Sequence, residues 1–374
     1  MPENIYVTRP TLPPLQDFVA SLESIWESRR LTNKGPFHDE FEAALAEHLG
    51  VPHVSLFCNG TIALQTALQA LRITGEVITT PYSFPATTHA IYWNRCMPVF
   101  CDIEPGGFNI DPEKVESLIS PNTTAIMPVH VYGIPCALER IQHIADIYGL
   151  KVIYDAAHAF GVRVHGESVL NFGDLSVLSF HATKIFNTIE GGALISHDPK
   201  MQERIDYLRN FGFADETTVV APGINGKMNE LQAAWGLLQL KTIDAEIAAC
   251  KEFAQRYREG LSGVPGITCI EDQPEIACNH CYFPILVDET AYGMSRDALY
   301  ETLKTLGIYG RRYFYPLLSH LPSYRNLPSA APGKLPEAVK RSLQIICLPI
   351  YADLGEANVD RVVNAIAEHA RPGR

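Results

Sequence analysis

The sequence predicts an α/β fold in which a mostly parallel sheet lies between helices, with a second, smaller α/β domain. The chain has 374 residues, is 47% apolar and 19% charged, and is long enough for a large core or two domains. Between residues 40 and 200, short β-branched runs alternate with helical patterns. This alternation is typical of parallel sheets covered on both faces by helices. A smaller alternation of strands and helices begins near residue 263.

Seven strands are expected in the larger domain because each segment is short, apolar and rich in β-branched residues. They are residues 53–58, 76–80, 98–103, 124–131, 151–155, 176–180 and 192–196. Helical patterns are expected at residues 61–71, 86–93, 112–119 and 138–148. In the last of these, apolar residues recur at helical spacing, which places them on one face.

The remaining elements predict where the two domains meet. A helix is expected over 199–212, a polar loop up to 228, and one long helix over 229–261. The boundary is placed near residue 245, inside that long helix. Residues 15–245 would then form the large domain, and residues 246–374 the small one, with help from residues 1–14.

Composition excludes several classes of function. The net charge of −12 argues against nucleic-acid binding, because phosphate backbones attract basic surfaces. No apolar run approaches the ~20 residues of a membrane span, and the start lacks a secretory pattern. The nine cysteines are scattered singly, which predicts reduced thiols and a cytoplasmic location. No metal site is expected.

An amine and a carboxylate at the ends of two expected strands carry the chemical argument. Asp155 closes one strand, and Lys184 follows another by a few residues. Pyridoxal phosphate (PLP) needs this pair, because an amine forms a Schiff base with its aldehyde and a carboxylate keeps its pyridine nitrogen protonated. A lone lysine after a strand is usually solvated. Here the neighbours Phe180, Ile185 and Phe186 are apolar, which lowers the proton affinity of an amine.

Side chains at these two strand ends and at two others could surround the rest of such a cofactor. At Gly60 and Thr61 a strand turns into a helix, whose free N–H groups can bind phosphate, and the Ser179 hydroxyl could join them. Phe84 could stack on a flat ring, and His158 could reach a ring substituent. Each motif alone also has a plainer interpretation: a capped helix, a core aromatic residue or a structural histidine.

In combination, the motifs resemble the sugar-nucleotide aminotransferases of the DegT/StrS group, which are fold-type I PLP enzymes. The matching segments span nearly the whole chain: Asn-Gly-Thr-x-Ala-Leu at 59–64, Thr-Pro-Tyr-Ser-Phe at 80–84, Tyr-Asp-Ala-Ala-His at 154–158, Ser-Phe-His-Ala-Thr-Lys at 179–184 and Glu-Gly-Gly-Ala at 190–193. Residues 31–36 and 223–234 match as well.

The resemblance implies a role for each cofactor residue. Lys184 would be the Schiff-base lysine, and Asp155 would pair with the pyridine nitrogen. The other expected roles are the ring hydroxyl for His158, stacking for Phe84, and phosphate binding for Gly60, Thr61 and Ser179.

The resemblance also implies a homodimer with shared active sites. Asn225 would reach the phosphate of the neighbouring subunit's cofactor, so each site would be built from both chains. Lys34, Glu190 and Tyr315 are expected on the substrate side.

The sequence around the lysine indicates which sugar position is aminated. Thr183 before the lysine and Glu190-Gly191-Gly192 after it are typical of relatives that act at C4. The expected reaction moves the amino group of L-glutamate to C4 of a nucleotide-linked keto sugar, with 2-oxoglutarate as the second product. The expected acceptor is dTDP-4-keto-6-deoxy-D-glucose and the product dTDP-4-amino-4,6-dideoxy-D-glucose, a sugar suited to lipopolysaccharide O antigen.

Three alternatives remain open at this point. The acceptor could be a 3-keto sugar or a UDP-linked 4-keto sugar. Relatives that dehydrate sugars carry His in place of the lysine, and Lys184 argues against that reaction. A PLP-binding regulatory protein without turnover would not need to keep Asp155 and Lys184 together.

Overall fold

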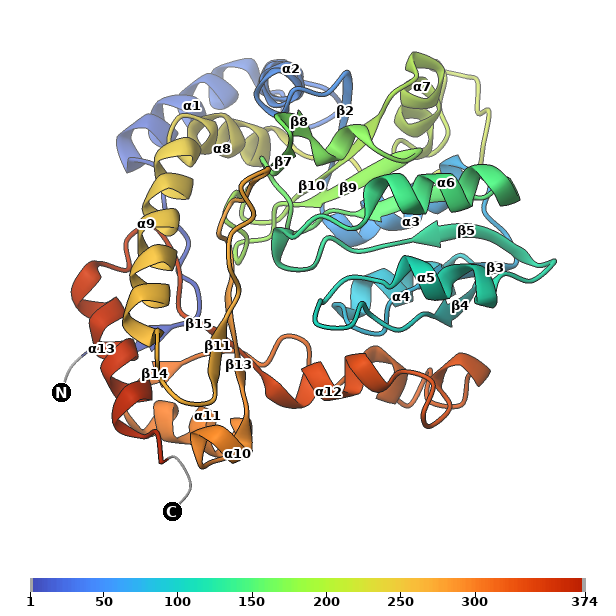
Figure 1. Ribbon diagram of the computed structural model, residues 1–374. Helices are drawn as coiled ribbons and strands as arrows, with labels where there is room; N and C mark the ends of the chain where they lie inside the picture. Colours follow the sequence, from blue (N-terminus) through green and yellow to red (C-terminus); the bar gives the residue numbers. More distant parts are fainter. Residues whose placement is uncertain (1–2, 372–374) are drawn as a thin grey trace.

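A seven-stranded sheet organises the first half of the structure, a computed structural model that describes residues 3–371 (Figure 1). Six strands are parallel, and β10 runs antiparallel to both of its neighbours. The predicted mixed, mostly parallel sheet is therefore confirmed. In spatial order the strands are β2 (His53–Phe57), β10 (Gly192–Ser196), β9 (Leu175–Ser179), β6 (Lys151–Asp155), β5 (Thr123–Met127), β3 (Glu76–Thr79) and β4 (Met97–Phe100).

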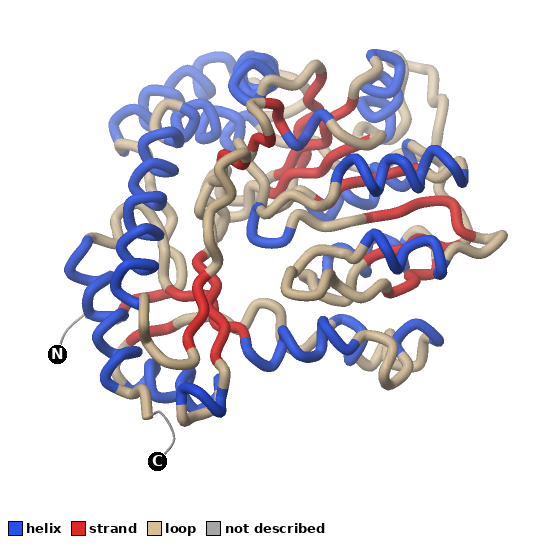
Figure 2. Tube along the Cα trace, in the orientation of Figure 1, coloured by secondary structure: helices blue, strands red, loops and turns tan. Residues whose placement is uncertain are grey.

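Helices cover both faces of this sheet, as Figure 2 shows by the blue helices around the red strands. One buried cluster joins the sheet to α2 (Pro36–Leu49) and α6 (Leu138–Tyr148). A second joins the opposite face to α3 (Gly60–Ala70), α4 (Pro85–Trp93) and α7 (Pro199–Leu208). In α6 the buried residues lie three or four positions apart, as the helical pattern predicted.

The other helices and strands lie outside the seven-stranded sheet and come before, between and after its strands in the sequence. In Figure 1, α9 stands upright beside α13, away from the large sheet. The helices are α1 (Leu15–Ser28), α5 (Pro112–Val115), α8 (Glu230–Leu240), α9 (Ile243–Leu261), α10 (Glu289–Tyr292), α11 (Arg296–Thr305), α12 (Pro336–Gln344) and α13 (Glu356–Glu368). The strands are β1 (Ile5–Tyr6), β7 (Arg163–Val164), β8 (Glu167–Ser168), β11 (Ile267–Cys269), β12 (Ile276–Ala277), β13 (Phe283–Val287), β14 (Ile308–Tyr309) and β15 (Ile345–Leu348).

Two predicted helices were wrong in length. The helix expected over 199–212 ends at Leu208, because Phe211 and Gly212 have φ of 57° and 82°, outside the right-handed helical region. The single helix expected over 229–261 is two helices, α8 and α9. Between them the Thr242 hydroxyl donates to the Gln239 backbone carbonyl at 3.3 Å, and such side-chain bonds to the backbone compete with helical geometry.

Several other predicted ends are also shifted. The strands expected at 98–103 and 124–131 end at Phe100 and Met127, beyond which Ile103 and Val129 form only single bridges. The helix expected over 112–119 is α5 followed by a 3₁₀ turn.

The domain boundary near residue 245 stays a prediction, and residues 1–2 and 372–374 of the proposed domains lie outside the described residues. A separate core cluster runs from Cys250 in α9 to Ile366 in α13 and includes Ile5. Strand β1 pairs in parallel with β14, so the N-terminal segment joins this C-terminal cluster. Within residues 3–371, no helix has the length and apolar character that a membrane span requires.

Candidate active site

A cavity of about 240 Å³ opens at the carboxyl ends of four parallel strands, β2, β3, β6 and β9. Ligands of open α/β sheets commonly bind at this edge. Eight of the eleven residues predicted from the sequence line the cavity: Gly60, Thr61, Phe84, Asp155, His158, Ser179, Lys184 and Glu190.

One end of the cavity is formed by the first turn of α3 against the end of β9. The Asn59 side chain caps the helix by accepting the Ile62 N–H at 2.9 Å, which leaves the N–H groups of Gly60 and Thr61 without partners within the helix. A Cβ at Gly60 would lie 3.0 Å from the Cβ of Ser179. Glycine therefore lets the helix start approach Ser179 closely, which forms a cradle of donors suited to a phosphate group.

Asp155 lies deeper in the cavity and is only 4% exposed. Its Oδ2 accepts a hydrogen bond from the Thr87 hydroxyl at 2.7 Å, and its Oδ1 accepts the Ala157 N–H at 3.2 Å. Burial raises the pKa of the carboxyl group, whereas these two donors and the Lys184 charge lower it. No ion pair involves Asp155 among residues 3–371. A buried carboxylate held in this way is suited to a cationic ligand atom.

The ring of His158 is held in a defined tautomer. Its Nδ1 accepts the backbone N–H of Tyr132 at 3.2 Å, so in the neutral ring the proton is on Nε2. Burial lowers the pKa of His158 well below its usual range, and the Lys184 charge acts in the same direction. The residue therefore presents a neutral N–H donor rather than a cation.

Lys184 lies in the loop that follows β9, with its Nζ 3.3 Å from the Tyr282 hydroxyl. Burial lowers its pKa from 10.5 to about 8, although Cys281 and Asp155 act in the opposite direction. A substantial fraction of the amine is therefore neutral near physiological pH, as a nucleophile requires. Phe84, the N-cap residue of α4, keeps its ring 57% exposed and available for stacking.

Sequence reasoning missed part of the cavity wall. Tyr282, Tyr313 and Phe314 complete it, and they follow the large sheet by more than 80 residues. Tyr313 and Phe314 belong to the segment 311–316, which resembles a substrate-side loop of the family, but only Tyr315 of that segment was predicted as a site residue. No motif near the strand ends could have indicated them. Ser83 and His181 also line the cavity, and both lie inside motifs that the resemblance had already matched.

Three predicted residues lie elsewhere in the single chain. Lys34 makes an ion pair with Asp206 at 2.9 Å. The Tyr315 ring faces the Arg296 and Arg312 guanidinium groups. Asn225 is exposed in the loop after α7. The roles expected for these three residues stay predictions.

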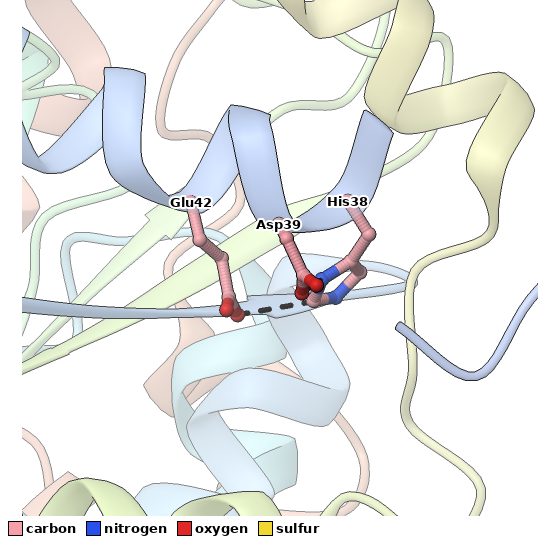
Figure 3. Close-up of side chains that lie close together, drawn as sticks. All are labelled: His38, Asp39 and Glu42. Atoms are coloured by element: carbon pink, nitrogen blue, oxygen red, sulfur yellow. Dashed lines mark ion pairs between the residues drawn. The ribbon is translucent and has the colours of Figure 1, made fainter. Parts of the chain in front are cut away.

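A possible cation site lies apart from the cavity, at His38, Asp39 and Glu42 of α2 (Figure 3). The Glu42 carboxylate already accepts a hydrogen bond from the Arg209 guanidinium at 2.8 Å. Burial and the Arg209 charge lower the pKa of His38 to about 4. A buried guanidinium this close disfavours a further cation, so we interpret the group as charge compensation for Arg209.

Comparison with known proteins agrees with this geometry. The profile of the DegT/DnrJ/EryC1/StrS aminotransferase family matches residues 15–367. The chain belongs to this family. This aminotransferase is 54% identical to a dTDP-4-amino-4,6-dideoxy-D-glucose transaminase of Escherichia coli, over 97% of this chain and 98% of the relative. It is 33% identical to a GDP-perosamine synthase of Caulobacter vibrioides, over 94% of each chain.

Solved structures agree with the aminotransferase fold. The crystal structure of DesI in the presence of its TDP-sugar product superposes with a TM-score of 0.94 at 36% identity, covering 99% of this chain and 94% of that one. Helicobacter pylori PseC, an aminotransferase of pseudoaminic acid biosynthesis, superposes with a TM-score of 0.91 at 28% identity, covering 98% and 99%. The predicted fold type and family are confirmed.

The aminotransferase is PLP-dependent, as its family implies, and the residues of the cavity fit this cofactor. The close approach of Gly60 to Ser179 forms an anion cradle at one end. Asp155 offers a buried carboxylate, and His158 offers a neutral donor. When bound, PLP supplies an aldehyde for a lysine amine and a pyridine ring that takes up electrons.

Proposed function

We propose that this enzyme transfers the amino group of L-glutamate to C4 of dTDP-4-keto-6-deoxy-D-glucose, forming dTDP-4-amino-4,6-dideoxy-D-glucose and 2-oxoglutarate. The observation that carries the proposal is the near full-length identity of 54% to the E. coli transaminase named for this product. A second relative of that name, from Shigella dysenteriae, is 48% identical over 98% of this chain and all of its own length. A cytoplasmic location fits this reaction and stays a prediction.

In this proposal Lys184 is both the covalent anchor and the base. Because burial lowers its pKa from 10.5 to about 8, the neutral amine is far more available at neutral pH than for an ordinary lysine, so it can attack a carbonyl carbon and later accept a proton. With PLP bound, the Lys184 amine would be the group placed to accept the α-carbon proton of the amino donor. In the sugar half-reaction, the same amine would return a proton to the sugar carbon.

The other residues orient and hold charge. Asp155 would keep a pyridine nitrogen protonated, and Thr87 holds its carboxylate in place. The Nε2–H group of His158 would donate a hydrogen bond to the ring oxygen, while Gly60, Thr61 and Ser179 would bind the phosphate. The Phe84 ring would cover one face of the cofactor and, with the aromatic residues of the cavity wall, would keep water away.

A homodimer is part of the proposal. The loop after α7 exposes five apolar side chains, which is unusual for the surface of a monomer. They are Phe211, Phe213, Val219, Val220 and Ile224, and Asn225 follows them directly. A second copy of the chain could cover this surface and receive Asn225 in its own cavity. Asn225→Ala should then weaken cofactor binding without altering any residue of its own cavity, and unchanged cofactor affinity in a dimer would contradict the shared site.

A spectroscopic and product assay tests the reaction. The cofactor-loaded enzyme should show a visible absorption band that glutamate bleaches, and a keto sugar should restore it. Amine located by NMR at C4 of the dTDP sugar supports the proposal. Amine at C3 would show that the acceptor is a 3-keto sugar, and preference for a UDP-linked sugar would show that the nucleotide is not dTDP. An absorption band without turnover would indicate a non-catalytic PLP-binding protein. Lys184→Ala that retained turnover would refute the mechanism.

A further inference from the structure

A histidine–carboxylate pair shares the cavity with Lys184 and has no role in the cofactor binding proposed above. His181 and Glu190 both line the cavity, and His181 Nε2 lies 3.5 Å from Glu190 Oε1. Their side chains are about half exposed, 46% and 54%. They are therefore accessible to a molecule that enters the cavity.

The position of this pair relative to Lys184 is fixed by the loop that carries all three residues. Two backbone hydrogen bonds close the loop, from Phe180 N–H to the Gly191 carbonyl at 2.8 Å and from Ala182 N–H to the Ile189 carbonyl at 2.9 Å. The Lys184 N–H also donates to the His181 carbonyl at 2.8 Å. A substrate atom held by the pair is thus placed at a defined distance from the lysine.

The hydrogen bonds of His181 decide which of its nitrogens carries the proton. Nδ1 receives the backbone N–H of Thr183 at 3.1 Å, and a backbone amide can only donate. Nδ1 is therefore unprotonated, and the Thr183 hydroxyl at 2.8 Å is a second donor to it. In the neutral ring the proton is on Nε2, directed toward Glu190, so the pair offers one N–H donor beside one carboxylate acceptor.

We propose that His181 and Glu190 recognise a hydroxyl group of the acceptor sugar next to its keto carbon, and that His181 is a specificity-determining residue for the sugar half of the reaction. A hydroxyl both accepts and donates, so it matches an N–H beside a carboxylate. A carboxylate of glutamate cannot donate and would be repelled by Glu190. The cavity must bind an anionic amino acid and a polyhydroxylated sugar ring in turn. The pair would favour binding of the sugar without favouring binding of the amino acid.

The inference rests on the proposed function. Measuring the glutamate and sugar half-reactions one at a time distinguishes failure of the inference from failure of the proposed function. His181→Leu removes the donor, and His181→Gln keeps an N–H donor. With His181→Leu, the KM for the keto sugar should rise about 3- to 10-fold, the effect of one lost hydrogen bond. The rate at which glutamate bleaches the cofactor band should stay within about twofold, and His181→Gln should recover part of the loss.

Equilibrium binding gives a readout that is independent of turnover. Calorimetry should show the dTDP-linked amino sugar binding more weakly to His181→Leu, whereas dTDP, which lacks the sugar, should bind both proteins equally. Equal loss for dTDP, an equally slowed glutamate step, or no change for the sugar would each overturn the inference. Failure of the wild-type enzyme to aminate any keto sugar would instead overturn the proposed function.

Discussion

Thr87 offers a sharp test of how the cavity keeps Asp155 ionised. The two residues and Ser83 form a chain of hydrogen bonds, with 2.7 Å between the Ser83 and Thr87 hydroxyls and 2.7 Å between Thr87 and Asp155. Since Thr87 donates to the carboxylate, it must accept its second bond from Ser83. Thr87→Val removes this donor while keeping the volume and the branched shape of the side chain.

The size of the expected effect follows from burial. Thr87 is fully buried, so no water can replace the lost hydroxyl. A hydrogen bond to a charged group contributes about 1.5–3 kcal/mol. The ionised carboxylate would lose that stabilisation, and it would hold a protonated pyridine correspondingly less well. The dissociation constant of PLP should therefore rise roughly 10- to 100-fold, because about 1.4 kcal/mol corresponds to a factor of ten.

The assay is cofactor titration of the cofactor-free protein, followed by absorbance, with Thr87→Ser as the matched control. Serine keeps the hydroxyl and loses only a methyl group, so its cost should appear in the melting temperature and not in PLP affinity. The pH at which the bound cofactor band changes should also shift in Thr87→Val alone. A Thr87→Val protein that binds PLP as tightly as wild type, with the same pH profile, would show that Thr87 is merely structural.

Three further predictions concern the same cavity. Burial raises the pKa of Asp155 in the folded state, so the cofactor-free protein should lose stability as the pH rises from the ordinary carboxyl pKa through that raised value. Asp155→Asn should remove this loss. The variant should melt at a higher temperature than wild type at neutral pH, and it should bind PLP more weakly. Lowering the Lys184 pKa from 10.5 to about 8 costs the folded protein about 3 kcal/mol when the amine is charged. Urea unfolding should therefore find cofactor-free Lys184→Met more stable than wild type below pH 8. The difference should shrink toward pH 10.5, because the wild-type amine loses its charge in the folded state. Gly60→Ala should raise the PLP dissociation constant roughly tenfold, because the added Cβ would lie 3.0 Å from the Ser179 Cβ and push Ser179 away. Unchanged affinity would mean that the cradle tolerates a methyl group.

The sheet and its helices were predictable because their signals are local. Strands such as 151–155 and 192–196, and the helix 138–148, match the structure at both ends, since apolar periodicity and flanking turns fix them. The helix expected over 199–212 could not be bounded in the same way. Its end depends on the positive φ of Phe211 and Gly212, which the apolar pattern does not reveal.

The candidate site was predictable where it follows strand ends and unpredictable where it does not. Gly60, Asp155 and Ser179 come together because parallel strands end at one edge of the sheet. Tyr282 and Phe314 reach the same cavity from two separate segments that carry no strand-end motif, so only the folded chain brings them there. Asn225 poses a different problem, because the role expected for it requires a second copy of the chain.

The segment Glu190-Gly191-Gly192 is one motif in the sequence but serves two purposes in the structure: close packing at the two glycines and a side chain in the cavity at Glu190. A Cβ at Gly191 would lie 1.9 Å from the Thr188 hydroxyl, and one at Gly192 would lie 2.7 Å from the backbone nitrogen of Gly60. The two glycines thus serve the packing of the lysine loop against the phosphate cradle. Of the three residues, Glu190 alone lines the cavity. Substitution of either glycine should therefore change cofactor binding, whereas among these three positions only substitution at 190 should change the choice of acceptor sugar.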